Sequence, residues 1–77
     1  MKNKKIFCRK LQKYSYPLML EPLPGSIGEK ILKEISKEAW DMWLSRQTIL
    51  INEYRLNLID EKSKDFLLEE MKKFLFS

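Results

Sequence analysis

The feature that most constrains the fold is a long helical pattern within Glu34–Asn57, EISKEAWDMWLSRQTILINEYRLN, which holds both tryptophans of the chain. One helical face gathers mostly large side chains: Trp40, Trp43, Gln47, Leu50 and Tyr54, with Ala39 and Ile51 beside them. The segment 48–51 is locally β-prone, but it lies inside the longer helical period. We therefore predict a helix over about 37–54 with Ser36 as its N-cap, and we expect both indole rings in the core.

An extended segment precedes this helix. Residues 4–11 contain a β-compatible run centred on Ile6 and Phe7, and residues 14–20 form a second extended candidate. Because Pro17 has no backbone N–H to donate, it belongs at a sheet edge or at the start of the strand. We predict a small hairpin over about 4–20, which must pack against helices because two strands alone are marginally stable.

Two further helices are predicted around the central one. The first covers about 26–35, where Ser26 and Glu29 have the spacing of a capping box. Gly28 inside it costs up to about 1 kcal/mol relative to alanine, unless another backbone, such as that of the hairpin, packs closely there. The last helix covers about 60–75, with Asp60 as its cap. The predicted fold is α+β, with a small N-terminal antiparallel β-hairpin packed against three α-helices.

Length and composition narrow the class of protein further. A chain of 77 residues has room for one core, so we expect a single domain over 1–77. No apolar run approaches the roughly 20 residues that cross a bilayer, and no apolar signal segment follows the basic N-terminus. One cysteine forms no internal disulfide, which fits a reducing compartment. We expect a cytoplasmic protein that does not insert into membranes.

The absence of histidine excludes histidine-based zinc sites, Ser-His-Asp triads and two-histidine iron sites. With one cysteine as well, a metal held by one chain would rest on carboxylates, carbonyls and water, which exchange divalent ions readily. We therefore expect no permanent cofactor. No pair of acid–base groups has a recognisable catalytic arrangement, so we expect no enzyme activity.

Cys8 is the one candidate nucleophile or soft ligand. Lys5, Arg9 and Lys10 surround it in sequence, and nearby positive charge lowers a thiol pKa. An exposed thiol of this kind could be oxidised reversibly or assist metal transfer. The alternative is a small buried residue that packs beneath the helices.

Three acids, Glu34, Glu38 and Asp41, are spaced so that their carboxylates line one side if the junction between the first two helices is nearly continuous. Such a set could hold a hydrated divalent ion weakly. Alternatively, Lys30 and Lys37 pair with these acids and the face is simply solvated.

The basic residues are concentrated at the N-terminus. Six of them precede the first acid, Glu21: Lys2, Lys4, Lys5, Arg9, Lys10 and Lys13. Within this arm Lys5, Arg9 and Lys10 are candidates for a partner surface, and Asn52, Glu53 and Arg55 form a second polar patch. The chain could thus be a small basic module that binds a partner or nucleic acid, or a helical adaptor that uses an exposed Trp40 face. No stacking pattern supports sequence-specific nucleic-acid binding.

Several segments along the chain have the order and spacing of a known family. They are Ile6–Cys8, Pro24-Gly25, Ile27-Gly28, Glu34–Trp40, Trp43, Gln47-Thr48, Leu50–Glu53, Leu56-Asn57, Glu70-Met71 and Phe74–Phe76. Over residues 5–76 the chain resembles the small bacterial Fe(II)-trafficking proteins (the YggX-like family), whose members usually continue into a polar tail.

This resemblance implies a cytoplasmic, mostly monomeric domain with a hairpin beside three helices. It implies a non-enzymatic mediator of the labile Fe(II) pool, which supports the synthesis and repair of iron–sulfur clusters and protects them from oxidative damage. Its partners would be iron–sulfur or other iron-requiring proteins, and Fe(II) would bind transiently and weakly. The cysteine singled out in the family matches Cys8, with an implied role in redox protection or iron handling.

Overall fold

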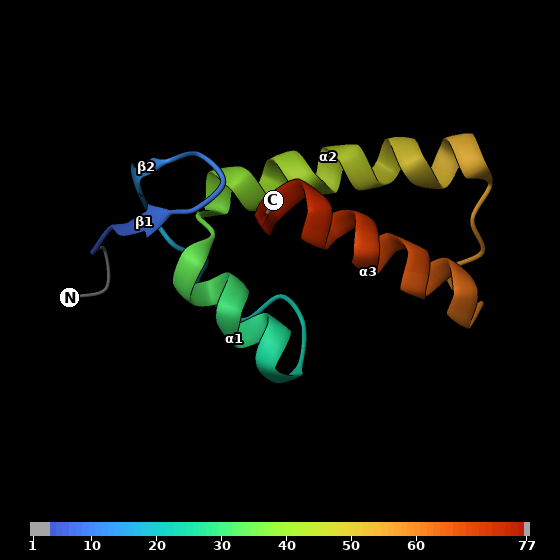
Figure 1. Cartoon of the computed structure of the whole chain (residues 1–77), viewed down its shortest axis with the longest axis horizontal. Coiled ribbons are helices and arrows are strands. Elements are labelled where there is room, and N and C mark those ends of the chain that lie inside the picture. Colours follow the sequence, from blue (N-terminus) through green and yellow to red (C-terminus); the bar gives the residue numbers. More distant parts are fainter. Residues whose placement is uncertain (1–3, 77) are drawn as a thin grey trace.

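A computed structural model describes residues 4–76 and has the predicted α+β architecture (Figure 1). The elements in chain order are β1 (Ile6–Cys8), β2 (Lys13–Ser15), α1 (Gly25–Glu34), α2 (Lys37–Tyr54) and α3 (Glu61–Phe76). The two strands pair antiparallel, with Ile6 opposite Ser15 and Cys8 opposite Lys13. The predicted hairpin is thus confirmed, with strands shorter than expected.

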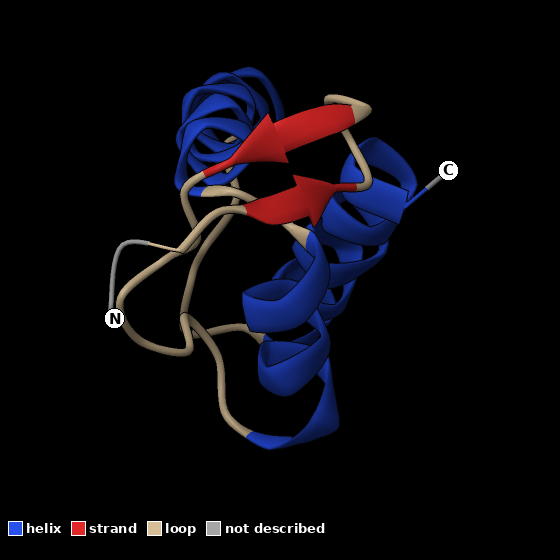
Figure 2. Ribbon diagram, turned by 90° about the vertical axis from the view of Figure 1, so that its left-hand side faces the viewer, coloured by secondary structure: helices blue, strands red, loops and turns tan. Residues whose placement is uncertain are grey.

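The helices α2 and α3 run antiparallel, so the last turn of α3 returns to the end of the molecule where α2 begins (Figure 1). The hairpin and α1 both lie at that end, and in the turned view the two strands of the hairpin face the viewer (Figure 1 and Figure 2). Within residues 4–76, no helix is long and apolar enough to cross a membrane. The N-terminal and C-terminal parts of the chain therefore meet at one end of a helical pair.

The core is a cluster of side chains contributed by β1 and all three helices. Its buried members are Cys8, Ile31, Ile35, Ala39, Trp43, Leu50, Leu67, Met71 and Leu75. Trp43 is 2% exposed and its ring centroid lies 6.0 Å from that of Phe74, so the expectation of a core position is confirmed for this residue. Trp40 is only half-buried and packs against the edge of the cluster.

The junction between α1 and α2 is a sharp break formed by Ile35 and Ser36. Both residues have extended backbone angles and both are 0% exposed. Ser36 accepts a hydrogen bond from the backbone N–H of Ala39 at 3.2 Å, which confirms its predicted N-cap role. The predicted bounds of α2 agree with the structure. An extended, buried junction gives the hairpin an edge to pair with.

The hairpin pairs with this junction through its backbone. Arg9 donates its N–H to the carbonyl of Glu34 at 2.8 Å, and Lys37 donates to Tyr16 at 2.9 Å. Pro17 forms an isolated antiparallel bridge with Ser36. The predicted second strand over 14–20 is therefore wrong in extent, because the chain leaves β1 after residue 15 and turns to the junction.

The cap of α1 differs from the sequence prediction. The helix begins at Gly25, the N-cap is Pro24, and no side chain caps the first turn, so the capping box of Ser26 and Glu29 is wrong. Gly25 has φ +80, an angle that glycine adopts without strain and that places the helix start before Ser26. The helix ends at Glu34, one residue earlier than expected, because Ile35 is extended.

The third helix is displaced by one residue, since it begins at Glu61 and ends at Phe76. Asp60 precedes it and accepts the backbone N–H of Lys64 through its carbonyl at 3.1 Å. Its carboxylate lies 3.4 Å from the hydroxyl of Ser63. Asp60 therefore occupies the predicted position, and its side chain contacts a hydroxyl in the first turn of α3.

Gly28 of α1 packs closely against the loop that precedes this helix. A Cβ at this position would collide with the backbone carbonyl of Leu23, so the close backbone is the loop before α1 rather than the hairpin. We expect Gly28→Ala to lower the free energy of unfolding by about 1–3 kcal/mol, because overpacking outweighs the better helix propensity of alanine. Urea denaturation would measure the change.

Ser26→Ala is the matched control, because Ser26 is exposed and caps nothing. We expect it to change stability by less than about 0.5 kcal/mol. A Gly28→Ala protein as stable as the wild type would show that the loop at Leu23 moves freely.

Candidate functional site

Cys8 ends β1 and its side chain is fully buried in the core. Its sulfur accepts the backbone N–H of Ser36 at 3.3 Å and that of Leu11 at 3.5 Å. The turn over residues 9–12 closes above it, with the N–H of Gln12 bonded to the Cys8 carbonyl at 2.8 Å. Of the two alternatives that the sequence left open for Cys8, the buried one is therefore confirmed.

The surroundings of the thiol act on its pKa in opposite directions. Burial, the largest influence, raises the pKa of Cys8, because it disfavours the charged thiolate. Hydrogen bonds from the side chain and backbone of Ser36, and from the backbone of Leu11 and Lys10, lower it. The lowering effects together prevail, so the pKa of Cys8 lies below the ordinary value of a cysteine thiol. Cys8 is thus a buried thiol in a pocket of donors that favours the thiolate.

The donors around Cys8 suit a sulfur anion better than a metal ion. The backbone N–H groups of Leu11 and Ser36 both point at the sulfur, and such donors repel a cation. Among residues 4–76, no group of three or more acidic or cysteine side chains is placed to hold a metal ion. The chemistry that this site can supply is thiolate chemistry, and a reagent reaches the sulfur only when the covering turn opens.

The three predicted carboxylates do not form one row. Because Ile35 and Ser36 are extended, the nearly continuous junction on which that expectation depended is wrong. Glu34 pairs with Arg9 at 3.4 Å, Glu38 with Lys13 at 3.6 Å, and Asp41 with Lys37 at 2.9 Å.

All six of these side chains are partly exposed, so each pair is worth only about 0–1 kcal/mol. The carboxylates are therefore accessible, but each already has its own cation. Of the two lysines expected to pair with them, Lys37 does so, whereas Lys30 lies over the ring of Phe76.

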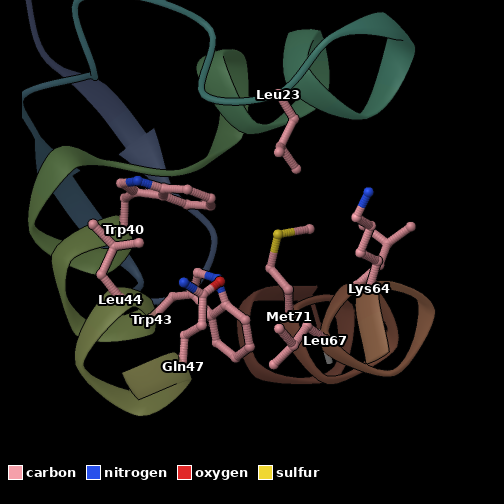
Figure 3. A pocket seen from close by; sticks show the side chains of 9 residues that line it. Leu23, Trp40, Trp43, Leu44, Gln47, Lys64, Leu67 and Met71 are labelled. Carbon is pink, nitrogen blue, oxygen red and sulfur yellow. The ribbon is translucent and has the colours of Figure 1, made fainter. Parts of the chain in front are cut away.

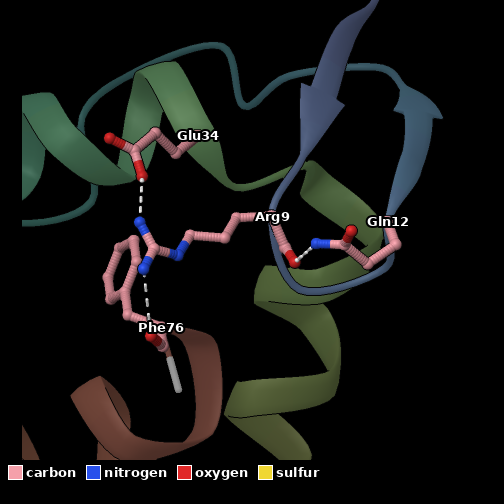
Figure 4. Close-up of polar contacts among 4 residues, drawn as sticks. All are labelled: Arg9, Gln12, Glu34 and Phe76. Atoms are coloured by element: carbon pink, nitrogen blue, oxygen red, sulfur yellow. Dashed lines mark hydrogen bonds and ion pairs between the residues drawn. The ribbon is translucent and has the colours of Figure 1, made fainter.

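Arg9 in the hairpin turn contacts both α1 and α3, an arrangement that the sequence alone did not predict. Its guanidinium lies 3.4 Å from the Glu34 carboxylate at the end of α1 and 3.4 Å from the carbonyl of Phe76 at the end of α3 (Figure 4). It also faces the ring of Phe76, with 5.8 Å from Cζ to the centroid. The turn that covers Cys8 is thereby fastened to both helices.

The candidate partner residues fall at opposite ends of the molecule. Arg9 and Lys10 lie in the hairpin turn, and Lys5 lies over the ring of Tyr16 at 5.2 Å. Lys2 lies outside the described residues. Asn52, Glu53 and Arg55 are exposed at the far end of α2, where Arg55 has φ 51 and closes the helix (Figure 1). The two predicted surfaces are therefore separate.

A cavity of about 330 Å³ opens between α2, α3 and the loop before α1 (Figure 3). It is lined by Leu23, Trp40, Trp43, Leu44, Gln47, Lys64, Leu67, Leu68 and Met71. Among residues 4–76, the half-buried amide of Gln47 has no hydrogen-bond partner. The lining contains no carboxylate, so this cavity is not suited to Fe(II).

Comparison with known proteins points to one family. The family profile described as bacterial Fe(2+) trafficking matches residues 1–77. A probable Fe(2+)-trafficking protein of Francisella tularensis subsp. novicida (strain U112) is 58% identical over 72 residues, covering 94% of this chain and 83% of that protein. One from Legionella pneumophila (strain Corby) is 51% identical over 74 residues, covering 96% and 83%.

The contacts of Cys8 predict the effect of removing the Ser36 hydroxyl. Ser36→Ala should raise the pKa of the Cys8 thiol, because the side-chain hydrogen bond that lowers it is lost. It should also cost about 1–2 kcal/mol of stability through the lost cap of α2. Titration of thiolate ultraviolet absorbance measures the pKa, with Ser26→Ala as control. An unchanged thiol pKa in Ser36→Ala would show that backbone N–H groups alone govern it.

Proposed function

The chain belongs to the bacterial Fe(2+)-trafficking family, and from this premise we propose that it is a non-enzymatic mediator of intracellular Fe(II) handling. In this role it supports the synthesis and repair of iron–sulfur clusters and protects them from oxidative damage. It acts in the cytoplasm as a monomer of one domain, and it meets iron–sulfur or other iron-requiring proteins. The observation that carries the proposal, beside family membership, is the buried Cys8 thiol with its lowered pKa.

The proposed iron association is transient and weak. The carboxylates of Glu34, Glu38 and Asp41 offer the oxygen ligands that Fe(II) accepts, but each must first give up a lysine or arginine partner. The ion pairs are exposed and worth little, so this exchange is easy and the resulting affinity is low. Such a chain passes iron on more readily than it stores it.

The proposed role of Cys8 is redox protection. Its thiolate reacts with a peroxide when the turn over residues 9–12 opens, and the sulfur becomes a sulfenic acid as the peroxide oxygen–oxygen bond breaks and hydroxide leaves. Cellular thiols then reduce the sulfenic acid through a mixed disulfide, releasing water. Burial keeps the thiol from reacting at every encounter, while the hydrogen bonds from Ser36 and Leu11 lower its pKa and so increase the fraction of thiolate.

A second candidate function is a small basic module that binds a partner or nucleic acid without direct iron binding. The formal net charge of +4 favours it. It differs from the first in needing no iron and no thiol. Direct Fe(II) binding is therefore the first point to test.

Anaerobic titration of the chain with Fe(II), followed by NMR, tests direct binding. We expect weak, fast-exchanging broadening of the amides around Glu34, Glu38 and Asp41, because solvated carboxylates hold divalent ions loosely. Cys8→Ser serves as the matched variant, and broadening at Cys8 that it abolishes would name the sulfur as a ligand. If millimolar Fe(II) perturbs no residue specifically, iron handling proceeds through protein partners.

Complementation tests the role of Cys8. In oxidant-stressed cells that lack the protein, we expect Cys8→Ser to fold but to leave iron–sulfur enzyme activity unrestored, because serine has no thiolate. Ile31→Val is the control for stability: it removes one methylene from the same core at about 0.5–1.5 kcal/mol and retains the thiol. Full recovery with Cys8→Ser would remove Cys8 from the mechanism.

A further inference from the structure

Cations from two separate elements, α1 and the hairpin turn, converge on the last turn of α3. Lys30 of α1 lies 4.7 Å from the ring centroid of Phe76, and Arg9 of the hairpin turn lies 5.8 Å from it. Lys10, also in that turn, lies 4.0 Å from the ring centroid of Phe74. Figure 4 shows the Phe76 ring beside the Arg9 guanidinium. Aromatic faces thus hold these charges in place.

Beside the Phe76 ring the surface is hollowed. The hollow has a volume of about 440 Å³ and is lined by Ser26, Ile27, Lys30, Lys72 and Phe76. Its lining therefore combines two ammonium groups and a hydroxyl with the apolar side chains of Ile27 and Phe76, and it contains no carboxylate. We call this hollow, together with Arg9 and Lys10, the basic surface.

The positive charge of the basic surface is only partly neutralised. Glu34 pairs with Arg9 at 3.4 Å and Glu69 pairs with Lys72 at 3.6 Å. Lys10 and Lys30 contact rings, and neither has a carboxylate within 4.0 Å anywhere in residues 4–76. An excess of cations therefore faces the solvent at this end of the molecule, where it attracts an anionic partner.

We propose that the basic surface docks an acidic segment of a partner protein, in which carboxylates alternate with apolar side chains. The carboxylates meet Lys10, Lys30 and Lys72, and an apolar side chain enters the hollow against Ile27 and Phe76. This inference rests on the proposed function, because the partner it describes is a protein that gives or receives iron.

An acidic protein segment fits this surface better than a nucleic acid. Single-stranded nucleic acids bind largely by stacking their bases on aromatic rings. Here Arg9 and Lys30 lie over Phe76, Lys10 lies over Phe74, and Phe74 also packs against Trp43. The rings are therefore occupied, and what remains free for a ligand is ammonium groups and a small apolar hollow.

The test uses the wild-type chain and two double variants that lose the same charge. Lys30→Gln/Lys72→Gln removes the two lysines of the hollow, whereas Lys62→Gln/Lys64→Gln removes two lysines from the first turns of α3, away from it. The probes are a fluorescein-labelled copolymer of glutamate and leucine and a single-stranded DNA of equal charge. Fluorescence anisotropy measures affinity, and NMR amide shifts locate the contact.

We expect the acidic copolymer to shift the amides of Ser26, Lys30 and Phe76, and the affinity to fall as salt shortens the Debye length from ~10 Å at 0.1 M to ~3 Å at 1 M. Lys30→Gln/Lys72→Gln should bind about tenfold more weakly, and the control double variant less than about twofold. Equal losses in both variants, no shifts at the basic surface, or tighter binding of the DNA to these residues would each overturn the proposal.

Failure of this proposal is distinguishable from failure of the proposed function. If Lys30→Gln/Lys72→Gln no longer binds the copolymer but still restores iron–sulfur enzyme activity in oxidant-stressed cells, the basic surface is not used and the proposed function stands. The Cys8→Ser complementation addresses the proposed function on its own, because Cys8 is buried beneath the turn and is not part of the surface.

Discussion

The buried, extended pair Ile35 and Ser36 is the constraint on which the rest of the structure depends. The hydroxyl oxygen of Ser36 accepts a hydrogen bond from the N–H of Ala39 and so caps the start of α2. The N–H of Ser36 donates to the sulfur of Cys8. The same residue bridges to Pro17, so one backbone segment joins the hairpin to two helices. Because these groups are 0% exposed, each unmade hydrogen bond would leave a buried polar group unpaired, which costs about 1–3 kcal/mol.

The proposed redox role of Cys8 opposes its structural role. As a core residue it must stay covered, whereas as a thiolate it must meet its reagent. The lowered pKa resolves part of this conflict, since it arises from the same hydrogen bonds that hold the hairpin on the junction. In that role, the reactivity of the Cys8 thiol depends on how often the turn over residues 9–12 opens. Opening the turn costs free energy because it breaks the contacts of Arg9 with Glu34 and Phe76.

Features with local signals were predictable from the sequence, and features that depend on tertiary contacts were not. The helical period of α2 and its N-cap at Ser36 are encoded by residues close together in the sequence, and both predictions are confirmed. The capping box at Ser26 failed because Pro24 and Gly25 start α1 earlier. The prediction that three carboxylates line one side is wrong, because it assumed helical spacing across a junction whose backbone is extended. Of the basic surface, Arg9 and Lys10 were candidates from the sequence, whereas Lys30 and Lys72 were not, because only the folded chain brings α1 and α3 to the hairpin turn.

The basic surface and the thiol are linked through one turn. Arg9 and Lys10 belong to the surface, and the same turn covers the sulfur of Cys8. A carboxylate that binds Arg9 competes with Glu34, which holds the guanidinium at 3.4 Å in the free protein. Docking of an acidic segment would thus weaken the ion pair between Arg9 and Glu34 that helps to keep the turn closed. Exposure of the thiol and binding of the partner would then be thermodynamically coupled. If the proposed docking occurs, contact with a partner protein, rather than metal binding, would control the chemistry of Cys8.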